Sequence, residues 1–216
     1  MKMLTIIALV LSMLAGAEAN AEIFILTQNA ITDTNPGLSN PYTSGQVVAQ
    51  NIIASGIGRG TGITSNAGTD RYSAKGWTLG AIPDVNDYFT FTLRPNPGYE
   101  LNFTSFVYTG QISASGPGSF AFRSSVDSFT TDIGSPAATG SIINLSAAEY
   151  QHLTDPVEFR LYGYSATGNT GTFSVNDYTF NGNAAPTPEP QTWVLLGIGA
   201  SLMLLNLLRK RWRIQL

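Results

Sequence analysis

A strict alternation of apolar and polar residues limits how this chain can fold more than any other feature. Residues 87–94 read Asp-Tyr-Phe-Thr-Phe-Thr-Leu-Arg, so two phenylalanines and a leucine share one face of an extended chain, opposite Tyr88, Thr90 and Thr92. Residues 157–162 repeat the pattern, with three apolar side chains facing inward and Glu158, Arg160 and Tyr162 facing outward. A period of two predicts strands that are buried on one face.

Glycine-rich and proline-rich turns separate these apolar runs. Glycine accounts for 22 of the 216 residues, and Asn-Pro-Gly and Pro-Asn-Pro-Gly are typical turn sequences. An aromatic content of 11% argues against disorder. The composition therefore predicts an all-β fold, either a sandwich or a barrel, for residues 22–185.

Three local features refine this prediction. The turn at residues 95–98 predicts a hairpin between residues 87–94 and 99–108, and residues 46–54 predict one earlier strand. Residues 56–62 contain four glycines without the Lys-Ser/Thr ending of a phosphate loop, so they indicate a Gly-rich edge or turn. Within residues 171–182 the apolar residues change parity at Asn176-Asp177, which predicts a β-bulge.

The amino-terminal residues 1–21 have the layout of a secretory signal peptide. Met1-Lys2 is followed by apolar residues 4–14 and then by small residues, with candidate cleavage sites after Ala19 and Ala21. We favour the second site. An uncleaved anchor is the alternative, but eleven apolar residues are short for a membrane span.

The carboxy-terminal residues 186–216 predict a membrane anchor. Residues 193–208 carry no charge, and sixteen residues of helix are roughly 24 Å long, a little less than a hydrocarbon core of ~30 Å. A buried core helix is the alternative, which the Pro-rich lead-in and the basic end at 209–213 oppose. By the positive-inside rule, four cations stop transfer and stay cytoplasmic: Arg209, Lys210, Arg211 and Arg213.

Pro188, Glu189 and Pro190, the apolar run and the basic end together resemble the PEP-CTERM sorting signal. This resemblance covers about thirty residues and implies export by a Gram-negative bacterium that makes extracellular polysaccharide. It also implies an inner-membrane precursor that an exosortase recognises through Pro188, Glu189 and Pro190 and then processes. The expected destination is the cell surface or the extracellular matrix. A Pro-rich structural linker before a plain anchor is the alternative.

A second resemblance covers about half of the chain. It includes Asp87-Tyr-Phe-Thr-Phe-Thr-Leu, Pro97-Gly98-Tyr99, Phe159-Arg-Leu-Tyr-Gly163 and the segment from Gly171 to Gly182. These pieces resemble a β-sandwich domain that is common in PEP-CTERM proteins. The resemblance implies a single jelly-roll-like sandwich, similar to carbohydrate-binding modules. Relatives carry Asp-Asn or Asp-Asp where this chain has Asn176-Asp177, which puts a shared ligand there in doubt.

Charge and cysteine content exclude several kinds of site. Between residues 22 and 187 twelve acidic residues oppose six basic ones, a net charge of about −6. Because nucleic-acid binding depends on phosphate neutralisation, this acidic segment without a basic cluster predicts no nucleic-acid partner. The chain has no cysteine, which excludes disulfides and thiolate metal sites.

Candidate ligands follow from side-chain chemistry. Four oxygen-bearing residues are candidates for a structural Ca²⁺ ion, although turn formation is the favoured explanation for them: Asp84, Asp87, Asn176 and Asp177. Three aromatic residues are candidates for a glycan platform, with core packing as the alternative: Tyr72, Trp77 and Tyr108.

The candidate chemistry does not indicate catalysis. The sole histidine, His152, has no nucleophile motif nearby, and nothing singles out a pair among the acids. We therefore predict a structural or adhesive protein with weak glycan contact, not an enzyme. A carbohydrate-active hydrolase, or its accessory binding module, is the alternative.

Overall fold

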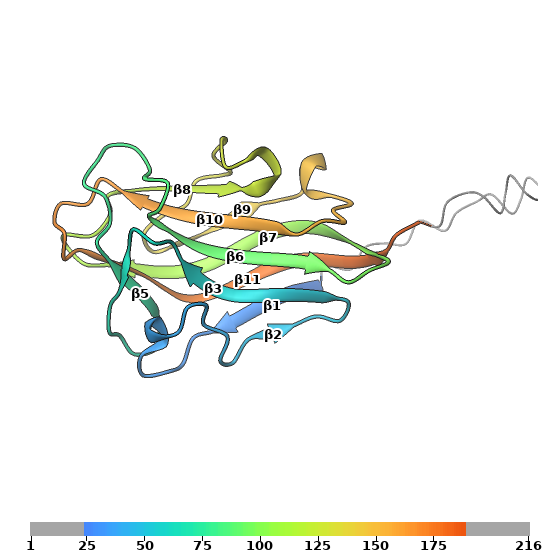
Figure 1. The fold of residues 1–216 in the computed structure, drawn as a ribbon, viewed down its shortest axis with the longest axis horizontal. Helices are drawn as coiled ribbons and strands as arrows, with labels where there is room; N and C mark the ends of the chain where they lie inside the picture. The colour runs from blue at the N-terminus through green and yellow to red at the C-terminus, as the bar shows by residue number, and fades with distance from the viewer. Residues whose placement is uncertain (1–23, 189–216) are drawn as a thin grey trace, which may run out of the picture.

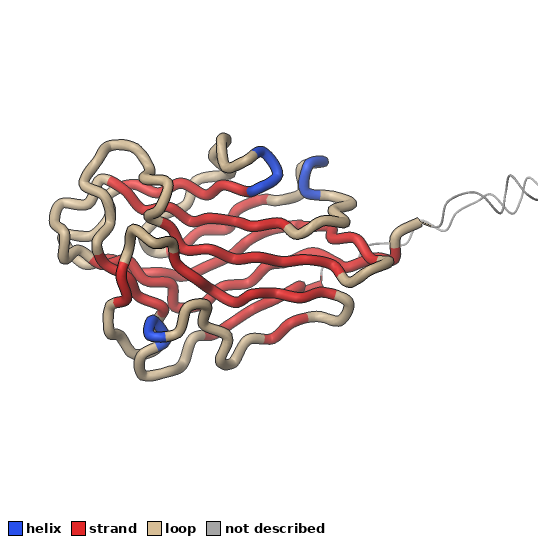
Figure 2. Tube along the Cα trace, viewed as in Figure 1, coloured by secondary structure: helices blue, strands red, loops and turns tan. Residues whose placement is uncertain are grey.

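The computed structural model describes residues 24–188, which form two antiparallel sheets packed face to face (Figures 1 and 2). Seven strands make the larger sheet: β1 (Phe24–Ala30), β2 (Val47–Val48), β4 (Thr64–Ser65), β5 (Tyr72–Lys75), β7 (Tyr99–Ile112), β9 (Gly140–Asn144) and β11 (Thr172–Pro186). Four make the smaller sheet: β3 (Ile52–Arg59), β6 (Tyr88–Pro95), β8 (Ser119–Ser124) and β10 (Val157–Tyr164). Short 3-10 turns occur at η2 (Pro36–Leu38), η3 (Ser125–Asp127) and η4 (Ala148–Tyr150). The predicted all-β sandwich is confirmed for these residues.

The larger sheet is built around β11. One side of β11 pairs with β7 from Phe173 to Pro186, and the other side pairs first with β5 and then with β1. The register shifts between Val175 and Asp177, which confirms the predicted bulge. A second shift occurs at Gly182, whose φ is 153°, and a Cβ there would lie 2.1 Å from a backbone oxygen of the neighbouring strand. Only glycine fits this approach of two backbones.

The smaller sheet has the strand order β3-β6-β10-β8. Its inner face carries the apolar residues of the predicted alternation, and its outer face carries the polar and aromatic ones. The glycines from Gly56 onwards fall in and just after β3, the outermost strand of this sheet, which pairs with β6 and has a single bridge from Ile57 to Tyr42 on its other side. The predicted Gly-rich edge is therefore confirmed.

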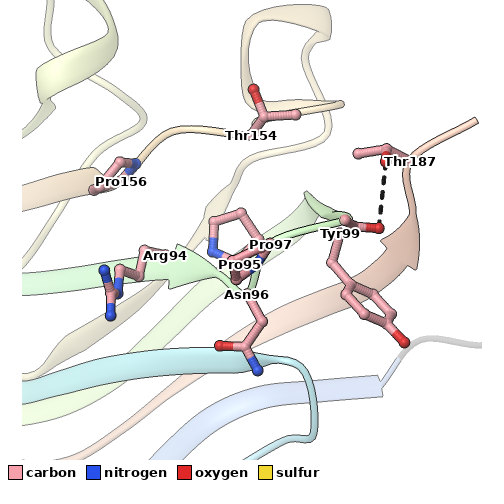
Figure 3. Close-up of a pocket in the computed structure, with 9 residues that line it drawn as sticks. Arg94, Pro95, Asn96, Pro97, Tyr99, Thr154, Pro156 and Thr187 are labelled. Atoms are coloured by element: carbon pink, nitrogen blue, oxygen red, sulfur yellow. Dashed lines mark hydrogen bonds between the residues drawn. The ribbon is translucent and has the colours of Figure 1, made fainter.

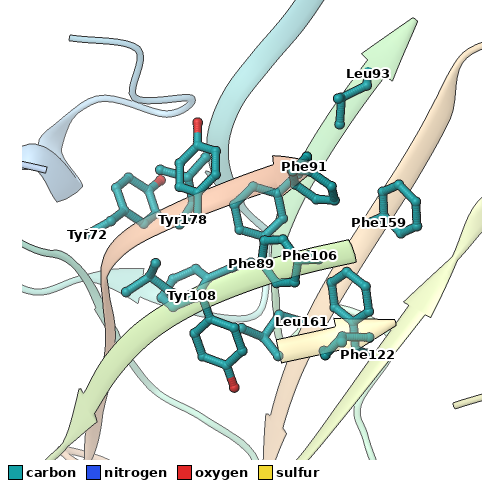
Figure 4. Packing of buried hydrophobic residues seen from close by; sticks show 14 of the residues in the cluster. Tyr72, Phe89, Phe91, Leu93, Phe106, Tyr108, Phe122, Phe159, Leu161 and Tyr178 are labelled. Carbon is teal, nitrogen blue, oxygen red and sulfur yellow. The ribbon is translucent and has the colours of Figure 1, made fainter. Parts of the chain in front are cut away.

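Aromatic side chains from both sheets fill the space between them (Figure 4). Phe91 of β6 contacts Phe106, Tyr178 and Phe180 of the opposite sheet, with ring centroids 4.9–5.6 Å apart. Edge-to-face and tilted pairs at this separation are favourable beyond the area that they bury. The alternating pattern of β6 thus becomes one wall of the core.

Two predicted connections are wrong. β6 and β7 do not form a hairpin, because the turn at residues 95–98 carries the chain from the smaller sheet to the larger one. Residues 46–54 do not form one strand, because Asn51 adopts a left-handed backbone (φ 66°) that separates β2 from β3. In both cases local turn chemistry does not reveal which sheet receives the next strand.

No helix between residues 24 and 188 is long and apolar enough to cross a membrane. The predicted signal peptide at 1–21 and the predicted span at 193–208 lie outside the described residues.

Candidate functional site

Polar and aromatic side chains gather on the outer face of the smaller sheet. We call this group the outer cluster, and it consists of Tyr88, Arg123, Phe129, Glu158, Arg160 and Tyr162. β6, β8 and β10 supply five of these residues. They meet because Tyr162 pairs with Tyr88 and Arg160 pairs with Arg123 across the ladders. Directly opposed residues share one face of a sheet.

Arg160 lies at the centre of the outer cluster. Its guanidinium carbon is 4.2 Å from the ring centroid of Tyr88 and 3.8 Å from that of Phe129, so two aromatic rings contact it. The rings of Tyr88 and Tyr162 are 5.4 Å apart in an edge arrangement. Cation–π contacts of this kind hold a guanidinium group without fully consuming its hydrogen-bond donors.

Two carboxylates complete the cluster's charge balance. Glu158 Oε1 accepts hydrogen bonds from Arg160 Nε at 2.7 Å and from Thr90 Oγ1 at 3.0 Å. Arg123 Nε donates to Asp132 Oδ1 at 2.6 Å. Burial alone lowers the pKa of Arg160, but the hydrogen bond and charge of Glu158 raise that pKa above its ordinary value. The cluster is therefore a zwitterionic surface at neutral pH.

A strained loop places Phe129 over the sheet. Ser128 and Phe129 both have left-handed backbones, with φ near 61°, which is costly for residues other than glycine. The loop is held by the Phe129 amide, which donates to Ser124 O at 2.8 Å, and by the Ile133 amide, which donates to Phe122 O at 2.7 Å. Such strain persists only where surrounding contacts determine the conformation.

The accessible parts of the outer cluster suit a neutral polar ligand. Tyr88 and Phe129 are half-buried and present ring surface, whereas Tyr162 is 3% exposed and packs against Tyr88. Burial raises the pKa of Tyr88, so its hydroxyl stays protonated and can both donate and accept. Aromatic surface beside guanidinium, carboxylate and hydroxyl groups matches the C–H face and hydroxyl rim of a sugar.

The predicted glycan platform is wrong. Tyr72, Trp77 and Tyr108 are 0%, 1% and 1% exposed, and all three belong to the core between the sheets. Their polar atoms have protein partners: Tyr108, for example, donates its hydroxyl to Ala137 O at 2.6 Å. Aromatic residue type alone does not separate core from surface, and the core alternative explains these residues.

The four predicted calcium ligands are divided between the two sheets. Asp84 and Asp87 precede β6 of the smaller sheet, whereas Asn176 and Asp177 lie on β11 of the larger sheet. Asp84 Oδ1 accepts from the Asn86 amide at 2.8 Å, and Asp177 accepts from the Thr109 hydroxyl. Among residues 24–188, no three His, Cys, Asp or Glu side chains are grouped to hold a metal ion. Asp84 and Asp177 thus bond neighbouring protein groups, whereas Asn176 Oδ1 is buried without a hydrogen-bond partner among residues 24–188.

Two shallow clefts lie away from the outer cluster. One, of about 240 Å³, lies where β6 ends and the chain leaves β11, and Pro95, Pro97, Tyr99, Pro156 and Thr187 help to line it (Figure 3). The other, of about 330 Å³, is lined by residues of β1, β2 and β11, including Gln28, Val47 and Thr179. Each cleft has one aromatic and one charged residue in its lining, Tyr99 with Arg94 in the first and Tyr178 with Asp177 in the second. The cation–π contacts among residues 24–188 all lie outside these two clefts.

The sorting residues lie at or beyond the end of the described chain. Pro188 is exposed and follows Thr187, whose amide donates to Gly98 O at 2.9 Å. Glu189, Pro190 and the stop-transfer residues Arg209, Lys210, Arg211 and Arg213 lie outside the described residues. The sorting motif therefore stays a prediction.

No protein-family model and no curated protein matches the chain. Among solved structures it is similar to a mutant of a carbohydrate binding module of family 29, with 14% identity and a TM-score of 0.36, over 75% of this chain and 92% of that chain. Two mutants of the module CBM29-2 show 15% identity and a TM-score of 0.34, over 74% of this chain and 92% or 93% of theirs. Likeness at this level carries no argument about a ligand.

Sequence reasoning placed part of the outer cluster correctly. The alternation predicted that Tyr88, Glu158, Arg160 and Tyr162 face outward, and the structure confirms it. It missed Phe129, which joins the cluster through a loop with no periodic pattern.

Proposed function

We propose that the chain is an exported surface protein whose jelly-roll-like sandwich makes weak contact with extracellular polysaccharide through the outer cluster. The single observation that supports this is the arrangement of Arg160 between Tyr88 and Phe129, beside the Glu158 carboxylate. An open surface with few aromatic rings suits weak, repeated contacts along a polymer rather than tight capture of one small molecule.

The proposed export route rests on the two ends of the sequence. The signal peptide at 1–21 sends the chain through the inner membrane, and the span at 193–208 holds the precursor there until an exosortase reads Pro188, Glu189 and Pro190. Mass spectrometry of the mature protein then finds its first residue at Asn20 or Glu22 and no residue beyond Pro190. An intact tail in cells that possess an exosortase contradicts the sorting proposal and leaves a plain anchor.

Retention on immobilised polysaccharides tests the binding proposal. The purified domain is retarded on at least one extracellular polysaccharide, and Tyr88→Ala weakens that retention about fivefold, the equivalent of about 1 kcal/mol. Ile142→Ala, which removes an exposed apolar side chain from the larger sheet, is the matched control and leaves retention unchanged. Equal loss in both variants contradicts a role for the outer cluster.

The same assay separates binding from hydrolysis. Released sugars in the flow-through contradict the non-enzymatic proposal and favour a carbohydrate-active hydrolase. Retention without release supports a binding or structural protein.

A further inference from the structure

We infer that the end of the sandwich from which Thr187 leaves is a membrane-facing surface that contacts lipid of the inner membrane's outer leaflet before processing. This inference rests on the membrane insertion of the tail in the proposed function. Its partner is a lipid surface. The surface consists of the exposed residues at this end, chiefly Phe24, Ile25, Ile53, Arg94 and Pro97, and is called the proximal surface below.

The chain leaves the sandwich directly from a hydrogen-bonded strand. β11 stays paired to its last residue, since Pro186 lies opposite Tyr99, and Thr187 still hydrogen-bonds to Gly98 through both its amide and its hydroxyl (Figure 3). The ordered ladder therefore reaches the residue before Pro188. No flexible spacer separates the sandwich from the sorting motif.

The segment between the sandwich and the predicted membrane span is short. Only residues 188–192 separate Thr187 from Trp193, where the predicted span begins. Six Cα-to-Cα steps cover at most about 22 Å even when fully extended. When residues 193–208 cross the bilayer, the end of the sandwich next to Thr187 is held within that distance of the lipid headgroups.

The proximal surface exposes apolar side chains and few acidic ones. β1 and β3 both begin toward the end of the sandwich where β11 ends (Figure 1). Phe24 and Ile25 begin β1, Ile53 lies opposite Arg94 at the start of β3, and all three apolar residues are exposed. Exposed apolar groups that cluster in this way mark interaction or membrane surfaces. Acidic groups are few here: Glu100 is buried and paired with His152 at 2.7 Å, and Asp155 is exposed near Pro156.

The opposite end of the sandwich provides an internal control. The loop between β5 and β6 exposes Leu79, Ile82 and Val85, which are equally apolar. β6 runs from this loop to the proximal surface, and its eight residues span about 26 Å. The tether that brings Ile53 to the membrane therefore holds Ile82 away from it.

Lipid quenching of single fluorescent labels tests this inference. Residues 22–216 are reconstituted into vesicles of phosphatidylethanolamine and phosphatidylglycerol, carrying Ile53→Cys, Pro97→Cys or Ile82→Cys. The chain has no cysteine of its own, so each variant has one labelling site. Headgroup-labelled quencher lipids are expected to reduce the emission of labels at positions 53 and 97 at least threefold more than that of the label at position 82. Pro97→Cys provides an independent reading if Ile53→Cys disturbs β3.

Flotation of the vesicles separates the two proposals. A chain that floats with the lipid but shows equal quenching at all three positions overturns this inference and leaves membrane insertion intact. A chain that does not float overturns the insertion of the tail and this inference together.

Discussion

Aromatic rings meet on both faces of β6, but their surroundings differ. On the inner face Phe91 packs against the rings of Phe106, Tyr178 and Phe180, and Phe89 on the same face is fully buried. On the outer face Tyr88 contacts Tyr162 and the guanidinium group of Arg160. The inner rings stabilise the fold through burial, whereas the outer rings hold charged groups at a surface. Because side chains alternate along β6, one strand contributes both to the core and to the charged surface.

Removing a ring from the core has the largest expected effect. Phe106 is fully buried and lies 4.5 Å from Phe180 and 4.7 Å from Phe122, centroid to centroid. Phe106→Ala is expected to lower the free energy of unfolding by about 3–5 kcal/mol, through lost transfer energy and a cavity. Urea unfolding measures it. Phe129→Ala in the outer cluster is the control, and an equal loss there contradicts the division between core and surface.

Alkaline pH is expected to weaken the core through the ionisation of a buried tyrosine. Burial raises the pKa of Tyr108 to about 12, whereas an exposed tyrosine has a pKa of about 10. Because the folded-state pKa is the higher one, this contribution to stability is complete below pH 10 and is lost between pH 10 and 12. The expected loss is about 2–3 kcal/mol.

Unfolding measured at pH 9, 10, 11 and 12 in the wild type and in Tyr108→Phe checks this. In the variant the free energy of unfolding still falls with rising pH, but less steeply than in the wild type, because burial also raises the pKa of Tyr178. An identical slope in both proteins contradicts the assignment to Tyr108.

Two buried tyrosines are expected to respond differently to loss of the hydroxyl. Tyr108 accepts from the Ala137 amide at 2.9 Å and donates to its oxygen, so Tyr108→Phe leaves backbone groups unpaired at a cost of about 1–3 kcal/mol. The Tyr178 hydroxyl is buried without a partner among residues 24–188, so Tyr178→Phe is expected to be neutral or slightly stabilising. Thermal or urea unfolding of both variants measures the contrast. A larger loss for Tyr178→Phe contradicts it.

The smallest effect is expected for the exposed ion pair between Arg123 of the outer cluster and Asp132. Asp132 is 54% exposed where it pairs with Arg123. Solvent screens such a pair, so Asp132→Asn is expected to change the free energy of unfolding by at most about 1 kcal/mol. The difference is expected to shrink further at high salt, because exposed ion pairs are screened. A loss comparable to that of Phe106→Ala is the result that would contradict a surface role.

Alternation and turn chemistry predicted much of the fold from local information. Strands at 87–94, 156–164 and 171–182 were expected from period-two patterns, and the structure has them at Tyr88–Pro95, Val157–Tyr164 and Thr172–Pro186. The bulge at Asn176 followed from the change of parity around it. These features are local, because the side-chain period and the cost of exposing apolar groups act within a few residues. The outward direction of the Tyr88 and Arg160 side chains is likewise a local feature that the alternation predicts.

Which strands pair with one another depends on the tertiary structure and could not be predicted from local sequence. The turn at residues 95–98 is equally compatible with a hairpin and with a crossing between sheets, and the packing of Phe91 against Phe106 and Phe180 selects the crossing. The same packing buries Tyr72, Trp77 and Tyr108, which are chemically suitable for a surface platform. Which residues alternate and where the turns occur can be read from the amino-acid order alone. Only the assembled sheets decided which aromatic rings are buried and which surround Arg160, because burial depends on neighbours that are distant in sequence.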